Sequence, residues 1–174
     1  MTLQVKRTGV TTFQGQPVTL LGDQVAAGDP APDFTVLAND FSPVTLAGTG
    51  SGVRIFSVVP SLETEVCDTQ TRRFTTEAAA LAGVTVWTVS ADLPFAQRRW
   101  CGASGLADVK TVSDHHDLSF GRAYGVAVAE LRLLARAVFV VDAADRIAHV
   151  EYVPEIVHHP DYAAALDAAK RAGS

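Results

Sequence analysis

Short runs of β-branched and aromatic residues recur along the chain and are separated by residues rich in glycine, proline and aspartate. Runs of this kind, bounded by turn residues, predict β-strands. The predicted strands cover residues 10–13, 17–21, 34–37, 44–46, 53–59, 84–89, 109–112, 137–141 and 146–153. A turn around Gly15 separates the first two runs, so the chain is expected to begin with a β-hairpin.

Several segments between these runs contain alanines and few helix breakers. In the first of them, apolar residues at Val66, Phe74, Ala78 and Leu81 favour a helix that ends at Gly83. The predicted helices span residues 63–81, 93–100, 118–124 and 161–172; Gly102 stops the second, Gly125 stops the third, and Asp161 begins the last.

The middle of the chain alternates strand and helix, and a hairpin and a closing helix follow. This order predicts an α/β fold with a mixed central sheet and helices on both of its faces. A chain of 174 residues can bury a full core without disulfides or metals. The sequence has no internal repeat, low-complexity tract or interdomain linker, so we expect one domain over residues 1–174.

Composition narrows the class of protein further. The net charge is −5 and the lysines and arginines are scattered, which argues against nucleic-acid binding. No apolar run reaches the roughly 18 residues that span a bilayer. The first residues lead into Gly, Thr and Gln rather than into an apolar signal core, so a cytoplasmic location is expected.

Cys67 and Cys101 are the only cysteines, too few for a disulfide scaffold. An arbitrary cysteine in such a chain is most often a small buried apolar residue. Cys67, however, lies where a predicted buried strand leads through Pro60 into a predicted helix. In the first turn of a helix, free backbone N–H groups and the helix dipole favour a thiolate, the nucleophilic form of cysteine. The position of Cys67 therefore predicts a reactive sulfur.

The neighbours of Cys67 both help and oppose this chemistry. Thr64 lies three residues earlier, on the same side of the turn, with its hydroxyl within reach of the sulfur. The ring of Pro60 can cover one side of the site and limit water. Glu63 and Glu65 disfavour a second negative charge nearby, so a cation is required.

Arg136 is the first candidate for this cation, because it lies directly before the apolar strand 137–141, at the edge of the core. A guanidinium can hold a thiolate and an oxygen of a second group together, because it presents several donors in one plane. An ordinary ion pair at a strand end is the alternative role for Arg136. The further candidates are Arg54, Arg72 and Arg73.

The spacing of Pro60, Thr64 and Cys67 at a strand-to-helix junction resembles the active-site motif of the peroxiredoxins. Residues 90–102, which include Cys101, resemble the signature of the bacterial thiol peroxidases, an atypical two-cysteine branch of that family. The other matching segments are residues 14–18, 123–127, 134–138 and 161–166. The resemblance covers nearly the whole chain, and its motifs are specific in combination.

This resemblance implies a thioredoxin-like fold with an N-terminal hairpin extension over residues 1–26. It implies that Cys67 is the peroxidatic cysteine and Cys101 the resolving one. Pro60, Thr64 and Arg136 are then the supporting residues. It further implies hydrogen peroxide and organic hydroperoxides as substrates, thioredoxin or a similar dithiol as reductant, no cofactor, and a homodimer.

The sequence departs from the family pattern at residues 128–133, where the family usually has a longer turn with glycine and proline. The matching of Arg136 is unaffected, but the local loop differs.

A second expectation concerns the two cysteines. Cys67 begins one predicted helix and Cys101 lies near the end of the next, beyond the roughly 7 Å between Cα atoms that a disulfide allows. Oxidation is therefore expected to unwind one of these segments, more easily the one that precedes Gly102 and Gly105.

Three other functions compete with a peroxidase. A disulfide oxidoreductase acting on proteins is disfavoured because Cys67 lacks a Cys-x-x-Cys partner. A redox-sensing module would use the same two cysteines as a switch without sustained turnover, and a purely structural role would leave both unreactive.

The histidines do not complete a zinc-like spacing, and we expect them to be solvated loop residues rather than metal ligands. They are His115, His116, His149, His158 and His159.

Overall fold

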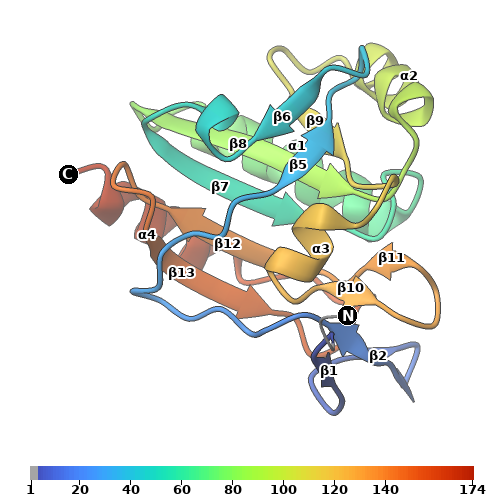
Figure 1. The fold of residues 1–174 in the computed structure, drawn as a ribbon. Coiled ribbons are helices and arrows are strands. Elements are labelled where there is room, and N and C mark those ends of the chain that lie inside the picture. The colour runs from blue at the N-terminus through green and yellow to red at the C-terminus, as the bar shows by residue number, and fades with distance from the viewer. Residues whose placement is uncertain (1–3) are drawn as a thin grey trace.

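A computed structural model describes residues 4–174 of the chain. Its centre is a seven-stranded sheet with the strand order β13-β12-β7-β8-β9-β5-β6 (Figure 1). These strands are β5 (Thr35–Leu37), β6 (Pro43–Thr45), β7 (Val53–Val58), β8 (Val84–Ser90), β9 (Thr111–Ser113), β12 (Ala137–Val141) and β13 (Ile147–Tyr152). Strands β7, β8 and β9 are parallel and the other pairs are antiparallel, so the sheet is mixed, as predicted.

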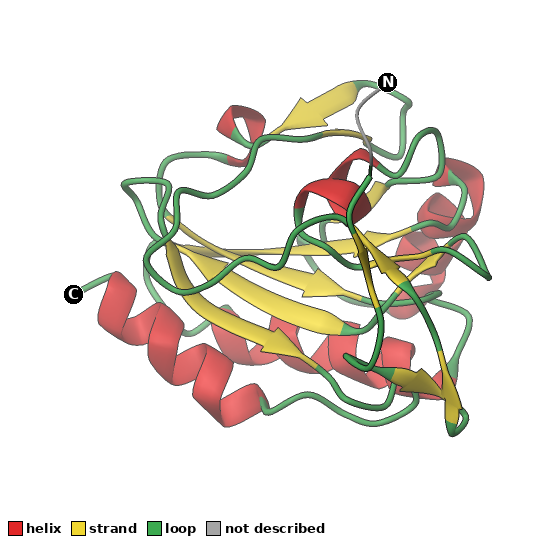
Figure 2. Cartoon of the chain, turned by 60° about the horizontal axis from the view of Figure 1, so that its bottom comes forward, coloured by secondary structure: helices red, strands yellow, loops and turns green. Residues whose placement is uncertain are grey.

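Helices cover both faces of this sheet, which confirms the predicted fold class (Figure 2). The helices are α1 (Glu65–Ala78), α2 (Pro94–Ser104), α3 (Ser119–Ala123), α4 (Tyr162–Ala172) and the 3-10 turn η1 (Ala47–Thr49). Helices α1 and α4 pack on strands β7, β8, β12 and β13, while α2 packs on β9 and α3 on β5. Within residues 4–174, no helix combines the length and hydropathy needed to cross a membrane.

The two faces have separate apolar cores, because successive residues of a strand point to opposite sides. On one face, Ile55 and Val138 pack against Phe74 of α1 and Tyr162 of α4. The other face is aromatic and contains Phe34, Phe56, Phe120, Tyr124 and Phe139. Because both faces are covered, every residue of β7 and β12 is buried, which explains why apolar residues predominate in both strands.

The N-terminal segment forms more than the single predicted hairpin. Strands β2 (Thr12–Phe13) and β3 (Gln16–Pro17) form a hairpin whose turn residues, Gln14 and Gly15, both have positive φ. Strand β1 (Lys6–Arg7) pairs with β4 (Leu20–Leu21), and β4 continues into a second sheet with β10 (Ala127–Val128) and β11 (Leu133–Leu134). The predicted strand 17–21 is therefore split, and the divergent segment 128–133 is a tight β-hairpin connection.

Two helix boundaries differ from the prediction. Helix α1 begins at Glu65 and ends at Ala78, several residues before Gly83, so the predicted range 63–81 is too long at both ends. Helix α2 does not stop near Gly102. It continues to Ser104 and ends at Gly105, whose φ of 71° lies in the left-handed region that favours glycine at a helix C-terminus.

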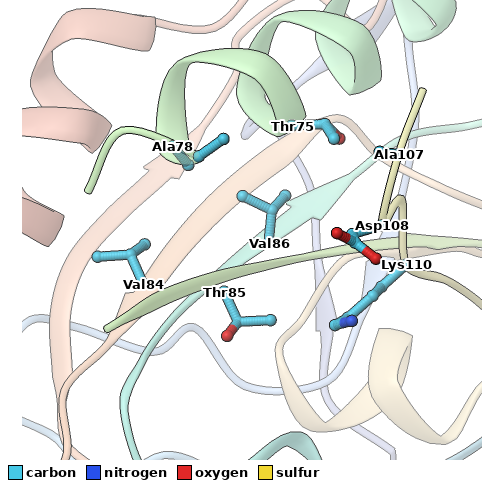
Figure 3. Close-up of a pocket in the computed structure, with 9 residues that line it drawn as sticks. Thr75, Ala78, Val84, Thr85, Val86, Ala107, Asp108 and Lys110 are labelled. Atoms are coloured by element: carbon cyan, nitrogen blue, oxygen red, sulfur yellow. The ribbon is translucent and has the colours of Figure 1, made fainter. Parts of the chain in front are cut away.

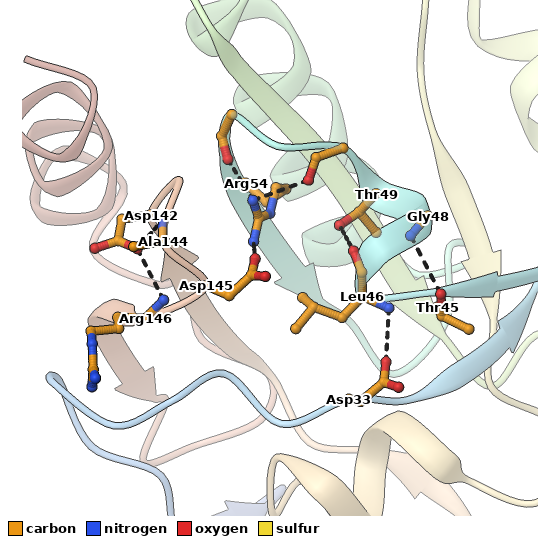
Figure 4. Close-up of polar contacts among 12 residues, drawn as sticks. Asp33, Thr45, Leu46, Gly48, Thr49, Arg54, Asp142, Ala144, Asp145 and Arg146 are labelled. Carbon is orange, nitrogen blue, oxygen red and sulfur yellow. Dashed lines mark hydrogen bonds and ion pairs between the residues drawn. The ribbon is translucent and has the colours of Figure 1, made fainter.

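A buried arginine ties the end of the sheet opposite the cysteines to the β12–β13 turn (Figure 4). Arg54 of β7 is fully buried and donates to the carbonyls of Gly50 and Gly52 at 3.1 and 2.6 Å. It also pairs with the carboxylate of Asp145, which lies in the turn between β12 and β13. A buried cation requires such partners, so Arg54 is engaged in the fold.

Asp114 holds the start of α3 against the end of β9. Its carboxylate is buried and accepts hydrogen bonds from the backbone N–H groups of Phe120 and Gly121, at 3.0 and 2.7 Å. Burial disfavours the ionised form and raises the pKa of Asp114 from 3.8 to about 7, although these hydrogen bonds act in the opposite direction.

The raised pKa of Asp114 predicts a pH-dependent stability. Between about pH 4 and pH 7 the folded protein keeps a proton that the unfolded chain releases. The contribution of Asp114 to stability is therefore complete below about pH 4 and is lost as the pH rises through about 7. In urea unfolding over this range, the wild-type free energy of unfolding should fall by roughly 2–4 kcal/mol more than that of Asp114→Asn. A difference between the two proteins that does not change with pH would contradict the prediction.

Candidate active site

Cys67 lies in the first turn of α1, directly after the loop that follows β7. Thr64 is the N-cap residue, with extended backbone angles of −105° and 150°. The preceding loop is fixed by Asp92, which accepts hydrogen bonds from the Ser61 hydroxyl at 2.7 Å and the Leu62 N–H at 2.8 Å. This confirms the predicted place of Cys67 at a strand-to-helix junction, and its side chain is fully buried.

Two polar side chains contact the sulfur of Cys67. The Thr64 hydroxyl lies 2.7 Å from Sγ, so it contacts the sulfur instead of capping the helix. Nη2 of Arg136 lies 3.3 Å from the same atom. A hydroxyl donor and a guanidinium within hydrogen-bonding distance can both stabilise a negative charge that develops on this buried sulfur.

The register of the sheet brings Arg136 to this position. Ala137, the first residue of β12, pairs with Val58, the last residue of β7. Arg136 therefore lies beside the point where the chain leaves β7 toward Cys67. Two residues distant in sequence, 67 and 136, meet because two adjacent strands end at the same edge.

Arg136 is itself buried, with 2% of its surface exposed, and each of its nitrogens has a partner. Nε donates to the carbonyl of Ile156 at 2.7 Å, and Nη1 donates to Oε1 of Gln70 at 2.8 Å. Gln70 is fully buried and its Nε2 donates to the Ser57 hydroxyl at 2.8 Å. These contacts orient the guanidinium so that Nη2 points at the sulfur of Cys67.

Gln70 is a site residue that was not predicted from the sequence. A signal was available, because Gln70 lies three residues after Cys67 and four before Phe74, on the face of α1 that enters the core. A polar residue at a core position of a helix needs a buried partner, and here that partner is Arg136.

The other candidate arginines are engaged elsewhere. Arg54 belongs to the cluster at the opposite end of the sheet. Arg72 pairs with Asp68 at 2.8 Å, and Arg73 pairs with Glu77. None of the three donates to the sulfur of Cys67 in the part of the chain that the structure describes, whereas Arg136 does.

A pocket of about 290 Å³ lies beside the start of α1. Thr64 and Arg136, the two residues in contact with the sulfur, line it together with Pro60. The remaining wall is largely apolar and is formed by Phe13, Val66, Leu133, Ile156 and Val157, with Gln14, Ser61 and Glu65 at the polar positions. Cys67 itself is fully buried and does not line the pocket, so the pocket meets the site at the two residues that contact the sulfur.

The N-terminal hairpin is anchored at this pocket by Glu155. The carboxylate of Glu155 accepts hydrogen bonds from the Thr12 hydroxyl at 2.7 Å and from the N–H groups of Gln14 and Gly15 at 3.0 and 2.9 Å. The next residue, Ile156, accepts the hydrogen bond from Arg136. The hairpin that contributes Phe13 is thus connected to the group that holds the guanidinium.

A larger hollow of about 440 Å³ lies between α1, β8 and the segment that leads into β9 (Figure 3). Thr75 and Ala78 form one side, Val84 and Val86 the floor, and Lys110 the far rim. Neither cysteine lines this hollow, and neither do Thr64 or Arg136, the residues that contact the Cys67 sulfur, so its size does not make it the reactive site.

Cys101 lies within α2, three residues before its end, and its side chain is half-buried. Its sulfur lies 3.3 Å from the hydroxyl of Thr111 and 3.7 Å from Nδ2 of Asn39. Cys101 also packs against the small apolar cluster that contains Cys67 and Trp100. Both cysteines are free thiols, so the structure is that of the reduced protein.

All five histidines were expected to lie in solvated loops, and His149 does not. His149 lies on β13 and is half-buried, and burial lowers its pKa. Among residues 4–174, no three His, Cys, Asp or Glu side chains are grouped so that they could hold a metal ion.

Comparison with known proteins agrees with this geometry. Residues 26–166 match the family described as Redoxin. The chain is 64% identical to a protein named thiol peroxidase from Halalkalibacterium halodurans over 92% of this chain and 97% of that protein. It is 57% identical to the thiol peroxidase of Bacillus subtilis over 91% of this chain and 95% of that protein.

Solved structures give the same result for the fold. A peroxiredoxin-like protein from Aquifex aeolicus superposes with a TM-score of 0.87 at 37% identity, covering 97% of this chain and 98% of that one. The thiol peroxidase from Chromobacterium violaceum, at 19% identity, shares the fold with a TM-score of 0.79 over 88% of this chain and 91% of that one. The chain therefore belongs to the Redoxin family and, within it, to the thiol peroxidases.

Proposed function

We propose that Cys67 is the residue through which this thiol-based peroxidase reduces hydrogen peroxide and organic hydroperoxides. One observation carries the proposal: the buried sulfur contacts the Thr64 hydroxyl at 2.7 Å and the Arg136 guanidinium at 3.3 Å, and both of these residues line an open pocket. No cofactor takes part in the proposed cycle, because the sulfur itself accepts the oxygen.

In the first step, the Cys67 thiolate attacks the terminal oxygen of the hydroperoxide. An S–O bond forms as the O–O bond breaks, so the sulfur is oxidised to a sulfenic acid and the peroxide is reduced. The leaving oxygen takes up a proton and departs as an alcohol, or as water from hydrogen peroxide. Arg136 and the N–H groups at the start of α1 stabilise the negative charge that moves from sulfur to oxygen.

Pro60 and Thr64 support this step without taking part in bond changes. Pro60 has no N–H and its buried ring forms one wall of the pocket, which limits the water that can solvate and weaken the thiolate. The Thr64 hydroxyl, 2.7 Å from the sulfur, can rotate between the thiolate and a peroxide oxygen as the charge moves.

In the second step, the Cys101 thiol attacks the sulfenic sulfur of Cys67. The S–S bond forms, the S–O bond breaks, and water leaves with the proton of Cys101. The Cys101 sulfur contacts Thr111 and Asn39 in the reduced protein, so it must leave these partners to reach Cys67. An external dithiol then exchanges with this disulfide, restores both thiols and is itself oxidised.

The partners of this cycle follow from its chemistry. A thioredoxin-type dithiol is the proposed reductant, and a compartment that maintains such dithiols, the cytoplasm, is the proposed location. A homodimer is proposed by resemblance to the family. We also propose that residues 1–174 act as one domain with residues 1–26 as an extension, since β4 pairs with β10 and the hairpin tip binds Glu155.

The proposed roles of the two cysteines predict how the masses of three proteins change after one equivalent of cumene hydroperoxide is added: the wild type, Cys101→Ser and Cys67→Ser. The reduced wild-type protein should lose a pair of hydrogens as Cys67 and Cys101 form a disulfide. Cys101→Ser should instead gain one or more oxygens at Cys67, and Cys67→Ser should not change. Intact-mass spectrometry measures all three.

The same proteins distinguish an enzyme from a sensor. With thioredoxin, thioredoxin reductase and NADPH, the wild type should consume many equivalents of peroxide, whereas a sensor would react once and stall. Oxidation of Cys67→Ser at the wild-type rate would contradict the proposal that Cys67 is the residue that reduces the peroxide.

The contact between Gln70 and Arg136 predicts that Gln70 positions the guanidinium. Gln70→Leu keeps the bulk of the side chain but removes the acceptor of Nη1, leaving one nitrogen of a buried cation without a partner. The second-order rate constant for oxidation of Cys67 should fall about tenfold, equivalent to about 1.4 kcal/mol.

Gln97→Leu is the matched control. Gln97 is also a fully buried glutamine whose Nε2 donates two hydrogen bonds, to Ser90 and Val112, but it does not contact Arg136. Its rate constant for oxidation of Cys67 should stay within about twofold of wild type. Equal losses in the two variants would show that the effect is one of general stability.

A further inference from the structure

The segments that carry the two cysteines are joined by direct contacts between side chains. Asp68, the residue after Cys67, accepts a hydrogen bond at 3.0 Å from the indole Nε1 of Trp100, the residue before Cys101. Asp68 belongs to the first turn of α1, and Trp100 lies near the end of α2. Both cysteines are free thiols whose sulfurs have other polar partners, so the two segments have to rearrange relative to each other before a disulfide can form.

Arg72 completes a ring of contacts around this hydrogen bond. Its Nε lies 2.8 Å from the second carboxylate oxygen of Asp68, and its Nη1 donates to the carbonyl of Ser104 at 2.8 Å. Its guanidinium carbon lies 5.4 Å from the centre of the Trp100 ring. We call Asp68, Arg72, Trp100 and the carbonyl of Ser104 the latch. The latch ties the last turn of α2 to the first turn of α1.

The opposite side of α2 is held by different groups. The Cys101 sulfur contacts Thr111, whose hydroxyl donates to Oδ1 of Asn39 at 3.1 Å. Consecutive residues of a helix point about 100° apart, so Trp100 can face α1 while Cys101 faces β9 and the turn after β5. In the reduced protein, both faces of the last turns of α2 are therefore fixed.

The latch is placed where it can open. Trp100 is buried, at 8% exposure, but the Asp68 and Arg72 side chains are 36% and 41% exposed. An open groove of about 380 Å³ runs along them between α1 and α2. Water in this groove can replace the partners of Asp68 and Arg72, and the left-handed Gly105 directly after α2 gives the chain a point at which to turn.

We infer that the latch sets the rate at which Cys101 resolves the sulfenic acid, with Asp68 and Trp100 as positioning residues. The inference rests on the proposed function and deepens it. While the latch is closed, α2 is folded, Cys101 is kept at Thr111, and Cys67 is in place for the peroxide. When it opens, the end of α2 can unwind and Cys101 can reach Cys67. The latch thus divides the sulfenic acid between disulfide formation and attack by a second peroxide, which gives a sulfinic acid.

Trp100→Phe tests this most directly, because it keeps an aromatic ring and the charge of Asp68 but removes the indole donor. Loss of one hydrogen bond of this kind shifts an opening equilibrium by roughly fivefold. The rate of disulfide formation should rise by about that factor, and the peroxide concentration that gives half-maximal sulfinic acid should rise with it. The rate constant for the first oxidation of Cys67 should stay within about twofold of wild type.

The two rates are separated by rapid mixing with one equivalent of cumene hydroperoxide, acid quenching, alkylation of the remaining thiols and intact-mass analysis. Asp68→Ala is the second variant, since it removes the same hydrogen bond from the other partner, and its disulfide formation should accelerate as well. Glu77→Gln is the control: it breaks an ion pair of the same spacing on the same helix, with Arg73, that does not reach α2.

Disulfide formation at the wild-type rate in both Trp100→Phe and Asp68→Ala would overturn the inference. Slower disulfide formation in either variant would also overturn it, because the latch would then present Cys101 to Cys67 rather than restrain it. Failure of the proposed function looks different: wild-type Cys67 would not be oxidised in the first phase, and no sulfenic acid would be available for either fate.

Discussion

The active site depends on one buried cation. The Arg136 guanidinium is almost wholly removed from water, and its three nitrogens contact the Ile156 carbonyl, the Gln70 side chain and the Cys67 sulfur. A charge at this depth is strongly unfavourable unless each hydrogen-bond donor is satisfied. The site is therefore specified by a charge that needs three partners, two from α1 and one from the loop after β13, and one of the three is the reactive sulfur.

The fold supplies these partners through the register of two strands. Pairing of Ala137 with Val58 places the start of β12 beside the end of β7, from which the chain enters α1. The loop that contains Ile156 follows β13, which pairs with β12. Glu155 binds the N-terminal hairpin to the same loop, so the pocket wall is fixed by the groups that fix the cation. A shift of the β7–β12 register would remove the guanidinium from the sulfur.

The two steps of the cycle place conflicting requirements on the cysteines. The folded structure meets the first requirement, and local unwinding of α2 meets the second. Cys67 reacts best when it is buried among its partners, whereas a disulfide requires that it meet Cys101, which is held at Thr111 within a folded helix. A rigid structure would satisfy the first requirement only. Half-exposed contacts between α1 and α2, a short final turn of α2 and Gly105 concentrate the necessary mobility at one end of one helix.

The sequence by itself determined the element order, the mixed sheet and the place of Cys67 at a helix start, since these follow from local patterns of apolar residues and helix breakers. It made Arg136 the first of four candidate arginines, and the family resemblance singled Arg136 out. Only the tertiary structure shows how Arg136 meets the sulfur, because this contact arises from pairing of strands far apart in sequence. Gln70, the latch at Asp68 and the extension of α2 through Gly102 to Gly105 were likewise settled only by packing. Each depends on which partner a polar side chain or a helix end meets across the fold, and no local pattern carries that information.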